Sequence, residues 1–140
     1  MKYRILIVDD EKEIRDMLSR HFRLKGYSCS TAEGVDAAEG VLQSELVHIV
    51  ISDIVMPGKS GTELMKLINE EYPMVKIIMI TGYVSLENAL TCMRRGADTC
   101  IFKPLGDLTE LDEAVHRAGA WHSRWLEKLH ILKDNRRGHE

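Results

Sequence analysis

Five polar residues follow or end short apolar runs of the sequence, and their side chains could bind a metal ion and a phosphate group. Asp9 and Asp10 follow ILIV, Asp53 ends VHIVISD, Thr81 ends KIIMIT, and Lys103 follows DTCIF. Adjacent carboxylates repel one another, more strongly where they are buried, so they need a counter-charge or water. Carboxylate and carbonyl oxygens are the ligands that Mg²⁺ takes. A hydroxyl and an ammonium suit the oxygens of a phosphate.

The elements that must position these residues alternate between two kinds of pattern. Short β-branched runs predict strands at 4–8, 27–31, 47–51, 76–80 and 98–102. Between the first two runs, Ile14, Leu18 and Phe22 recur with helical spacing. Gly26 and Gly96 stand where helices should end.

Three polar residues are predicted to cap the N-termini of helices. Asp10 and Asp107 each precede a glutamate by three residues, which is the spacing of a capping box. Ser85 precedes a helix that begins at Leu86.

This alternation predicts an α/β fold, a doubly wound five-stranded parallel sheet with flavodoxin-like strand order 2-1-3-4-5. In such a sheet the ligand crevice lies at the carboxyl ends of the strands, where all five polar residues would meet. A simpler interpretation makes them helix caps and solvated loop residues. Their recurrence at four separate strand ends favours a Mg²⁺ site with a phosphate beside it.

Four segments resemble the receiver domain of two-component response regulators, the chemotaxis-receiver-like family. They are LIVDDEKEIRDML, ISDIVMPGKSG, MITG and FKP, in this order. The resemblance covers residues 1–119 and implies the receiver fold derived above. Residues 120–140 would be a C-terminal helical extension or a linker.

The resemblance implies a role for each matching residue. Asp53 would accept a phosphoryl group from a sensor histidine kinase or a phosphotransfer protein. Asp9, Asp10 and Asp53, with the backbone carbonyl of Val55, would bind Mg²⁺. Thr81 and Lys103 would contact the phosphoryl oxygens, and the peptide bond before Pro104 is expected to be cis. Such a domain is a signalling module that catalyses only its own phosphorylation and dephosphorylation.

The switch that would report phosphorylation departs from the family pattern. Relatives usually carry an aromatic residue three positions before the lysine, where this chain has Cys100. Thr81 is expected to move toward the phosphoryl group. Tyr83, two residues further on, could replace the missing aromatic ring.

Composition narrows the class of protein. The 140 residues carry 22 acidic and 19 basic side chains, a net charge of −3, which does not indicate nucleic-acid binding. No apolar run approaches the roughly 18 residues that span a bilayer, and the N-terminus lacks a secretory signal. The three cysteines, Cys29, Cys92 and Cys100, form no CxxC pair. We therefore expect a reduced, cytoplasmic protein.

A heptad pattern continues past the region that resembles a receiver. Its positions are Leu108, Leu111, Val115, Ala118, His122, Trp125, Leu129 and Leu132. The first half should pack on the sheet, whereas no sheet remains to cover the second half. The extension could pair with a second copy, as could the face formed by the fourth helix, fifth strand and fifth helix. The alternative is a frayed linker toward an output domain.

One class of enzyme uses similar residues. Phosphohydrolases of the haloacid dehalogenase type also use a strand-end aspartate and Mg²⁺, but they carry a second aspartate two residues later. Here that position is Val55. The spacing therefore favours the receiver.

Overall fold

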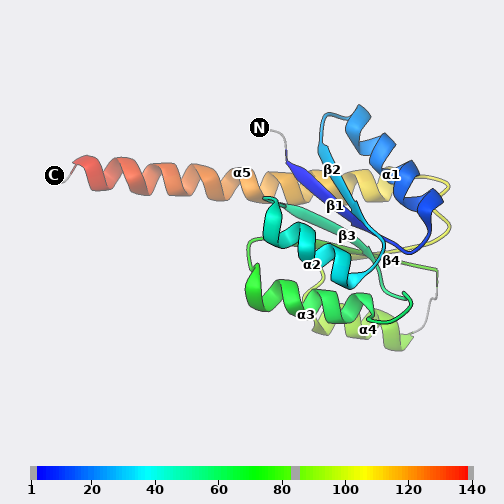
Figure 1. Ribbon diagram of the computed structural model, residues 1–140. Helices are drawn as coiled ribbons and strands as arrows, with labels where there is room; N and C mark the ends of the chain where they lie inside the picture. Colours follow the sequence, from blue (N-terminus) through cyan, green and yellow to red (C-terminus); the bar gives the residue numbers. More distant parts are fainter. Residues whose placement is uncertain (1–2, 83–85, 139–140) are drawn as a thin grey trace.

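The computed structural model describes residues 3–82 and 86–138, and its centre is a parallel five-stranded sheet (Figure 1). The strands are β1 (Arg4–Val8), β2 (Ser28–Ala32), β3 (Ile49–Asp53), β4 (Lys76–Thr81) and β5 (Thr99–Phe102). Their order is β2-β1-β3-β4-β5, which confirms the predicted fold class and topology.

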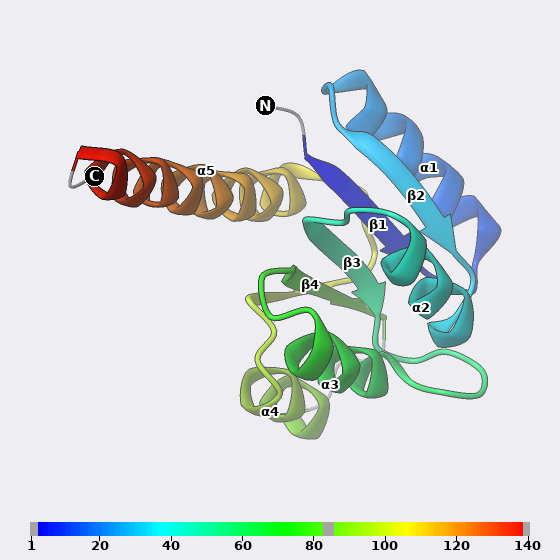
Figure 2. The ribbon, with the colours of Figure 1, turned by 60° about the vertical axis from the view of Figure 1, so that its left-hand side comes forward.

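Helices cover both faces of the sheet (Figures 1 and 2). They are α1 (Lys12–Leu24), α2 (Val35–Ser44), α3 (Gly61–Glu71), α4 (Leu86–Arg94) and α5 (Thr109–Gly138). Alternate residues of each strand point to opposite faces, so two apolar cores form. Ile5 and Ile7 belong to the core shared with α1 and α5, and Leu6 and Val8 to the core shared with α2, α3 and α4.

The predicted strand at 47–51 lies two residues too early. Val47 is buried against the α2 side of the sheet, but it precedes the strand, which runs from Ile49 to Asp53. A buried loop residue extends an apolar run as effectively as a strand residue does. Asp53 is the last residue of β3, at the strand end where the sequence places it.

The helix ends follow the sequence signals only in part. Gly26 and Gly96 adopt φ values of 99° and 86°, as expected for residues that end helices. The prediction that Asp10 caps α1 is wrong, because α1 starts after Glu11, whose side chain makes no capping hydrogen bond. Asp107 does bond the start of α5, since its Oδ1 accepts the amide N–H of Thr109 at 2.9 Å. The predicted cap Ser85 lies outside the described residues.

Helix α5 has 30 residues, which corresponds to about 45 Å. Its first half packs on the sheet through Leu111, Val115 and Ala118, and its second half projects past the amino ends of the strands (Figures 1 and 2). The described residues of the extension stay helical to Gly138, so they are not frayed, and whether the extension is a linker stays a prediction. Among the described helices, none combines the length and apolar character that crossing a bilayer requires.

A cluster of buried rings holds α5 where it leaves the sheet. Nε2 of His122 donates to the carbonyl oxygen of His48 at 2.8 Å, and Nδ1 of His48 accepts the backbone N–H of Arg4 at 3.0 Å. The Tyr3 ring contacts both imidazoles, with centroid distances of 5.0 Å to His48 and 5.5 Å to His122, and the two imidazoles lie 5.4 Å apart. Burial lowers the pKa of both imidazoles, so both are held neutral.

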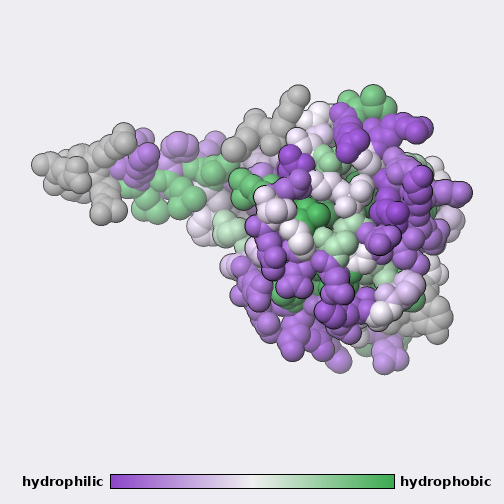
Figure 3. Space-filling model, in the orientation of Figure 1, coloured by the Kyte–Doolittle hydropathy of each residue, from purple (hydrophilic) through white to green (hydrophobic). Residues whose placement is uncertain are grey.

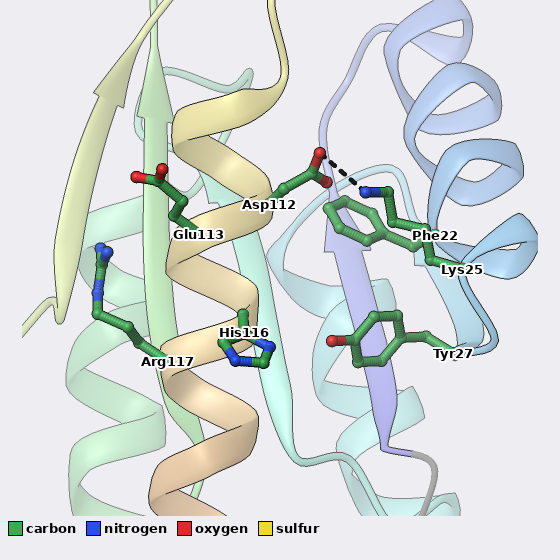
Figure 4. Close-up of a pocket in the computed structure, with 7 residues that line it drawn as sticks. All are labelled: Phe22, Lys25, Tyr27, Asp112, Glu113, His116 and Arg117. Carbon is green, nitrogen blue, oxygen red and sulfur yellow. Dashed lines mark ion pairs between the residues drawn. The ribbon is translucent and has the colours of Figure 1, made fainter.

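An open groove of about 530 Å³ separates α1 from α5 (Figure 4). Asp112 of α5 bridges it through contacts of 2.6 Å to Nε2 of His21 and 3.1 Å to Nζ of Lys25. Tyr27 and His116 face one another further along the groove (Figure 4). These contacts fix α5 against α1, at a place separate from the strand ends that carry the carboxylates.

Candidate metal and phosphoacceptor site

Three carboxylates meet at the carboxyl edge of the sheet. Oxygens of Asp9, Asp10 and Asp53 lie within 4.8 Å of one another. Asp9 is fully buried, Asp53 is 5% exposed, and Asp10 is exposed to solvent. An all-oxygen set of this kind fits a hard cation such as Mg²⁺, which would complete its octahedral shell with water and other oxygens.

Lys103 supplies the positive charge that the buried carboxylates share. Its Nζ lies 3.0 Å from Oδ2 of Asp53 and 3.2 Å from Oδ2 of Asp9. Burial disfavours the ammonium, but the hydrogen bond to Asp53 and the charges of both aspartates outweigh it and raise the pKa of Lys103. The peptide bond between Lys103 and Pro104 is cis, the conformation expected from the sequence.

Asp9 is fully buried, and burial disfavours the charged form of its carboxyl group. Burial raises its pKa despite the opposing effects of the Glu11 amide, which donates to its Oδ1 at 2.9 Å, and of Lys103. The backbone around it is also fixed, because Arg15 donates from Nη1 to the carbonyl oxygen of Asp9 at 2.7 Å. One ammonium therefore leaves the burial of Asp9 only partly compensated, and a divalent cation would add the missing charge.

Asp53 is held through its side chain and through its backbone carbonyl. The amide of Val55 donates to its Oδ1 at 3.2 Å, and the Ser52 hydroxyl donates to its carbonyl oxygen at 3.0 Å. Gly61, the first residue of α3, packs so closely that a Cβ there would lie 2.2 Å from that carbonyl oxygen. Sequence reasoning missed Gly61, together with Glu11 and Arg15. The available signal was the glycine that ends the segment ISDIVMPGKSG.

Thr81 and Lys103 come from adjacent strand ends. Thr81 is buried at the end of β4, and its carbonyl oxygen accepts the backbone N–H of Lys103 at 2.8 Å. Val55 is 54% exposed, and the role of its carbonyl as a metal ligand stays a prediction. Tyr83 lies outside the described residues.

Cys100 occupies the position of the expected switch on β5. It is half-buried, and its thiol hydrogen-bonds that of Cys92 on α4. Burial, with the neighbouring Cys100, raises the pKa of Cys92 to about 12, so this thiol is protonated and unreactive. Whether Cys100 takes part in a switch stays a prediction.

The doubly wound fold, with its acidic cluster at the carboxyl ends of the strands, is the arrangement that the resemblance to receiver domains implies. The model of the response regulator receiver domain matches residues 5–116, so the chain belongs to this family. Curated relatives include the response regulator protein FleR of Pseudomonas aeruginosa, 33% identical over 118 residues, which are 84% of this chain and 25% of FleR. The regulatory protein AtoC of Escherichia coli is 34% identical over 128 residues, 91% of this chain and 28% of AtoC.

Solved structures agree with this assignment. The response regulator protein TrrA of Thermotoga maritima, in complex with Mg²⁺ and BeF, is 36% identical with a TM-score of 0.75 and covers 84% of this chain and 99% of its own. A CheY-like receiver domain protein of Methanospirillum hungatei is 31% identical with a TM-score of 0.81 and covers 89% and 99%. The chain spans about a quarter of the length of the curated relatives that it matches.

Proposed function

We propose that Asp53 accepts a phosphoryl group from the phosphohistidine of a sensor histidine kinase or phosphotransfer protein, in a reaction that requires Mg²⁺. The observation that carries this proposal is the meeting of three carboxylates within 4.8 Å, with Lys103 on two of them. Asp9, Asp10 and Asp53 would hold the ion, and the carbonyl of Val55 would be a further ligand. When bound, Mg²⁺ neutralises charge on the phosphoryl oxygens.

The side chains of the site have separate tasks. An oxygen of Asp53 attacks the phosphorus atom in line with the breaking P–N bond, and the leaving imidazole keeps the bonding electron pair and takes up a proton. Lys103, already 3.0 Å from Asp53, donates to a phosphoryl oxygen. Thr81 offers its hydroxyl from the neighbouring strand. The product is an acyl phosphate, whose lability suits a signal that must be reset.

The proposed output is a changed surface. Residues 1–119 would form the receiver unit, which catalyses only its own phosphorylation and dephosphorylation, and residues 120–140 its extension. Thr81, Tyr83 and Cys100 are the proposed switch positions. The changed surface would act through association with a second copy, by the α4–β5–α5 face or by the end of α5. The proposed location is the cytoplasm, with no direct contact to nucleic acid.

The test is incubation with Mg²⁺ and acetyl phosphate, followed by intact-mass measurement. Wild type should gain the mass of one phosphoryl group, and chelation of the metal should prevent the gain. Asp53→Asn should gain nothing, whereas the control Asp16→Asn, on the exposed side of α1, should label like wild type. Equal labelling of Asp53→Asn, or labelling that survives chelation, would contradict the proposal.

A further inference from the structure

One charged side chain of α1 reaches back to the strand end that carries the acidic cluster. Arg15 lies one helical turn after Glu11, and its backbone N–H donates to the carbonyl oxygen of Glu11 at 3.2 Å. The side chains of an α-helix lean toward its N-terminus. The guanidinium therefore reaches the turn that precedes the helix, where Nη1 donates to the carbonyl oxygen of Asp9 at 2.7 Å.

Asp10 is the carboxylate of the cluster whose side chain is least firmly held. The side chains of Asp9 and Asp53 each accept a hydrogen bond from a backbone amide and another from the ammonium of Lys103. The Asp10 side chain is exposed, and it makes no hydrogen bond within the part of the chain that the structure describes. Its position within 4.8 Å of the other two carboxylates therefore depends on its backbone.

Two hydrogen bonds fix the peptide groups on either side of Asp10. The peptide group that follows it is held through the amide of Glu11, which donates to Oδ1 of Asp9 at 2.9 Å. The peptide group that precedes it is held through the carbonyl oxygen of Asp9, which accepts from Arg15. These two planar groups define the backbone dihedrals of Asp10, and so the direction of its side chain. Arg15 therefore helps to aim the Asp10 carboxylate at the cluster.

The charge of Arg15 and its hydrogen bond have opposite effects on a metal ion. A guanidinium near the cluster repels a divalent cation. If Arg15 acted through its charge alone, its removal would strengthen the binding of Mg²⁺. If Arg15 positions Asp10, its removal weakens that binding. The direction of the change in metal affinity therefore distinguishes the two roles.

We propose that Arg15 is a positioning residue of the Mg²⁺ site, which holds the carbonyl oxygen of Asp9 and thereby keeps Asp10 directed at the ion. This inference rests on the proposed function, which supplies the ion. Arg15 makes no ion pair with the carboxylates of the cluster, so it acts through the backbone of the turn. Groups that orient metal ligands from outside typically change metal affinity roughly 10–100-fold when they are removed.

Calorimetric titration of the metal-free full chain with Mg²⁺ tests the inference. Arg15→Met keeps an apolar stem but removes the donor, and it should raise the dissociation constant of Mg²⁺ roughly 10–100-fold. Arg15→Lys keeps a donor on a flexible stem and should recover part of this loss. Circular dichroism verifies that the variants stay folded.

The matched control is Arg20→Met, which removes the same charge from the same helix. The outer surface of α1 is hydrophilic (Figure 3), and Arg20 is one of its exposed residues. Because exposed charges are screened by salt, this variant should change the dissociation constant of Mg²⁺ by less than about threefold.

The Mg²⁺ dependence of labelling by acetyl phosphate separates positioning from a general loss of structure. Arg15→Met should need more Mg²⁺ for half-maximal labelling, yet approach the wild-type rate at saturating Mg²⁺, because Asp53 and Lys103 are unchanged. A rate that stays low at every Mg²⁺ concentration, an unchanged Mg²⁺ affinity or a tighter one overturns the role of Arg15, and the proposed function then stands on wild-type labelling. Failure of the wild-type chain to bind Mg²⁺ overturns both.

Discussion

Gly61→Ala is expected to damage both the stability of the domain and the proposed phosphorylation of Asp53. A Cβ at this position would lie 2.2 Å from the carbonyl oxygen of Asp53 and 2.9 Å from Cα of Ile54. Non-bonded atoms pack at roughly 3.5 Å, so the methyl group must open this gap by more than about 1 Å. Both neighbours are backbone atoms, and they cannot rotate away as the end of a side chain would.

The magnitude follows from overpacking in a close-packed interior. The free energy of unfolding should fall by about 1–3 kcal/mol or more. This is less than the stability of a typical domain, so the variant should still fold. Because α3 then pushes on the strand end that carries Asp53, labelling by acetyl phosphate should slow by roughly tenfold to a hundredfold. Urea unfolding and the time course of intact mass measure the two effects.

Gly40→Ala is the matched control. Gly40 lies inside α2, is exposed, and has no atom within 4 Å of the position a Cβ would take. Alanine is the better helix former there, so the same substitution should stabilise the domain by about 0.5–1 kcal/mol and leave labelling unchanged. If Gly61→Ala unfolds and labels like wild type, the contact between α3 and the Asp53 backbone does not hold that strand end, and the reasoning is refuted.

Three further predictions concern charged groups. Lys103→Met should raise the pKa of Asp9 further, because the ammonium that opposes its burial is lost, and NMR titration of the carboxyl group measures the shift. Burial lowers the pKa values of His48 and His122 in the folded chain. Below about pH 6.5 the unfolded chain therefore binds more protons than the folded chain. The free energy of unfolding should then fall as the pH is lowered from there. Measured by urea unfolding, the free energy of unfolding of the double variant His48→Asn, His122→Gln should fall less over this pH range than that of wild type. An equal fall in both proteins would contradict the conclusion that these two histidines cause it. Asp112→Asn should cost about 0.5–1 kcal/mol at neutral pH, because its contacts to α1 are partly exposed, and thermal unfolding measures the loss.

The sheet order and the meeting of the site residues could be predicted because both depend on periodicity. Alternating strands and helices with right-handed crossovers leave few topologies, and all of them bring parallel strand ends to one edge. Asp9, Asp53 and Lys103 could therefore be placed together without any knowledge of distances. The start of β3 could not be predicted, because Val47 is buried although it lies in the loop before the strand, and it therefore lengthens the apolar run.

Contacts that arise where two segments of the backbone pack closely could not be predicted from the sequence. Asp10 has the spacing of a helix cap, but α1 begins at Lys12 with Glu11 in the cap position, and Asp10 belongs to the acidic cluster instead. The sequence does not single out Gly61, because its close approach to the backbone of Asp53 arises only when α3 packs against the end of β3. At such positions the local sequence is compatible with more than one structure, and the tertiary contact determines which one forms.

The charges of the site explain why metal and phosphoryl group should bind together. The three carboxylates of the cluster outnumber the single ammonium of Lys103, which Glu11 also approaches to 3.7 Å, and the burial of Asp9 makes the uncompensated negative charge costly. The proposed phosphorylation would convert the Asp53 carboxylate into a group carrying roughly −1.5 to −2 charges, so the deficit would grow unless a divalent cation were present. A phosphorylated site would then bind Mg²⁺ more tightly than the resting site. By reciprocity, Mg²⁺ must favour the phosphorylated state by the same factor.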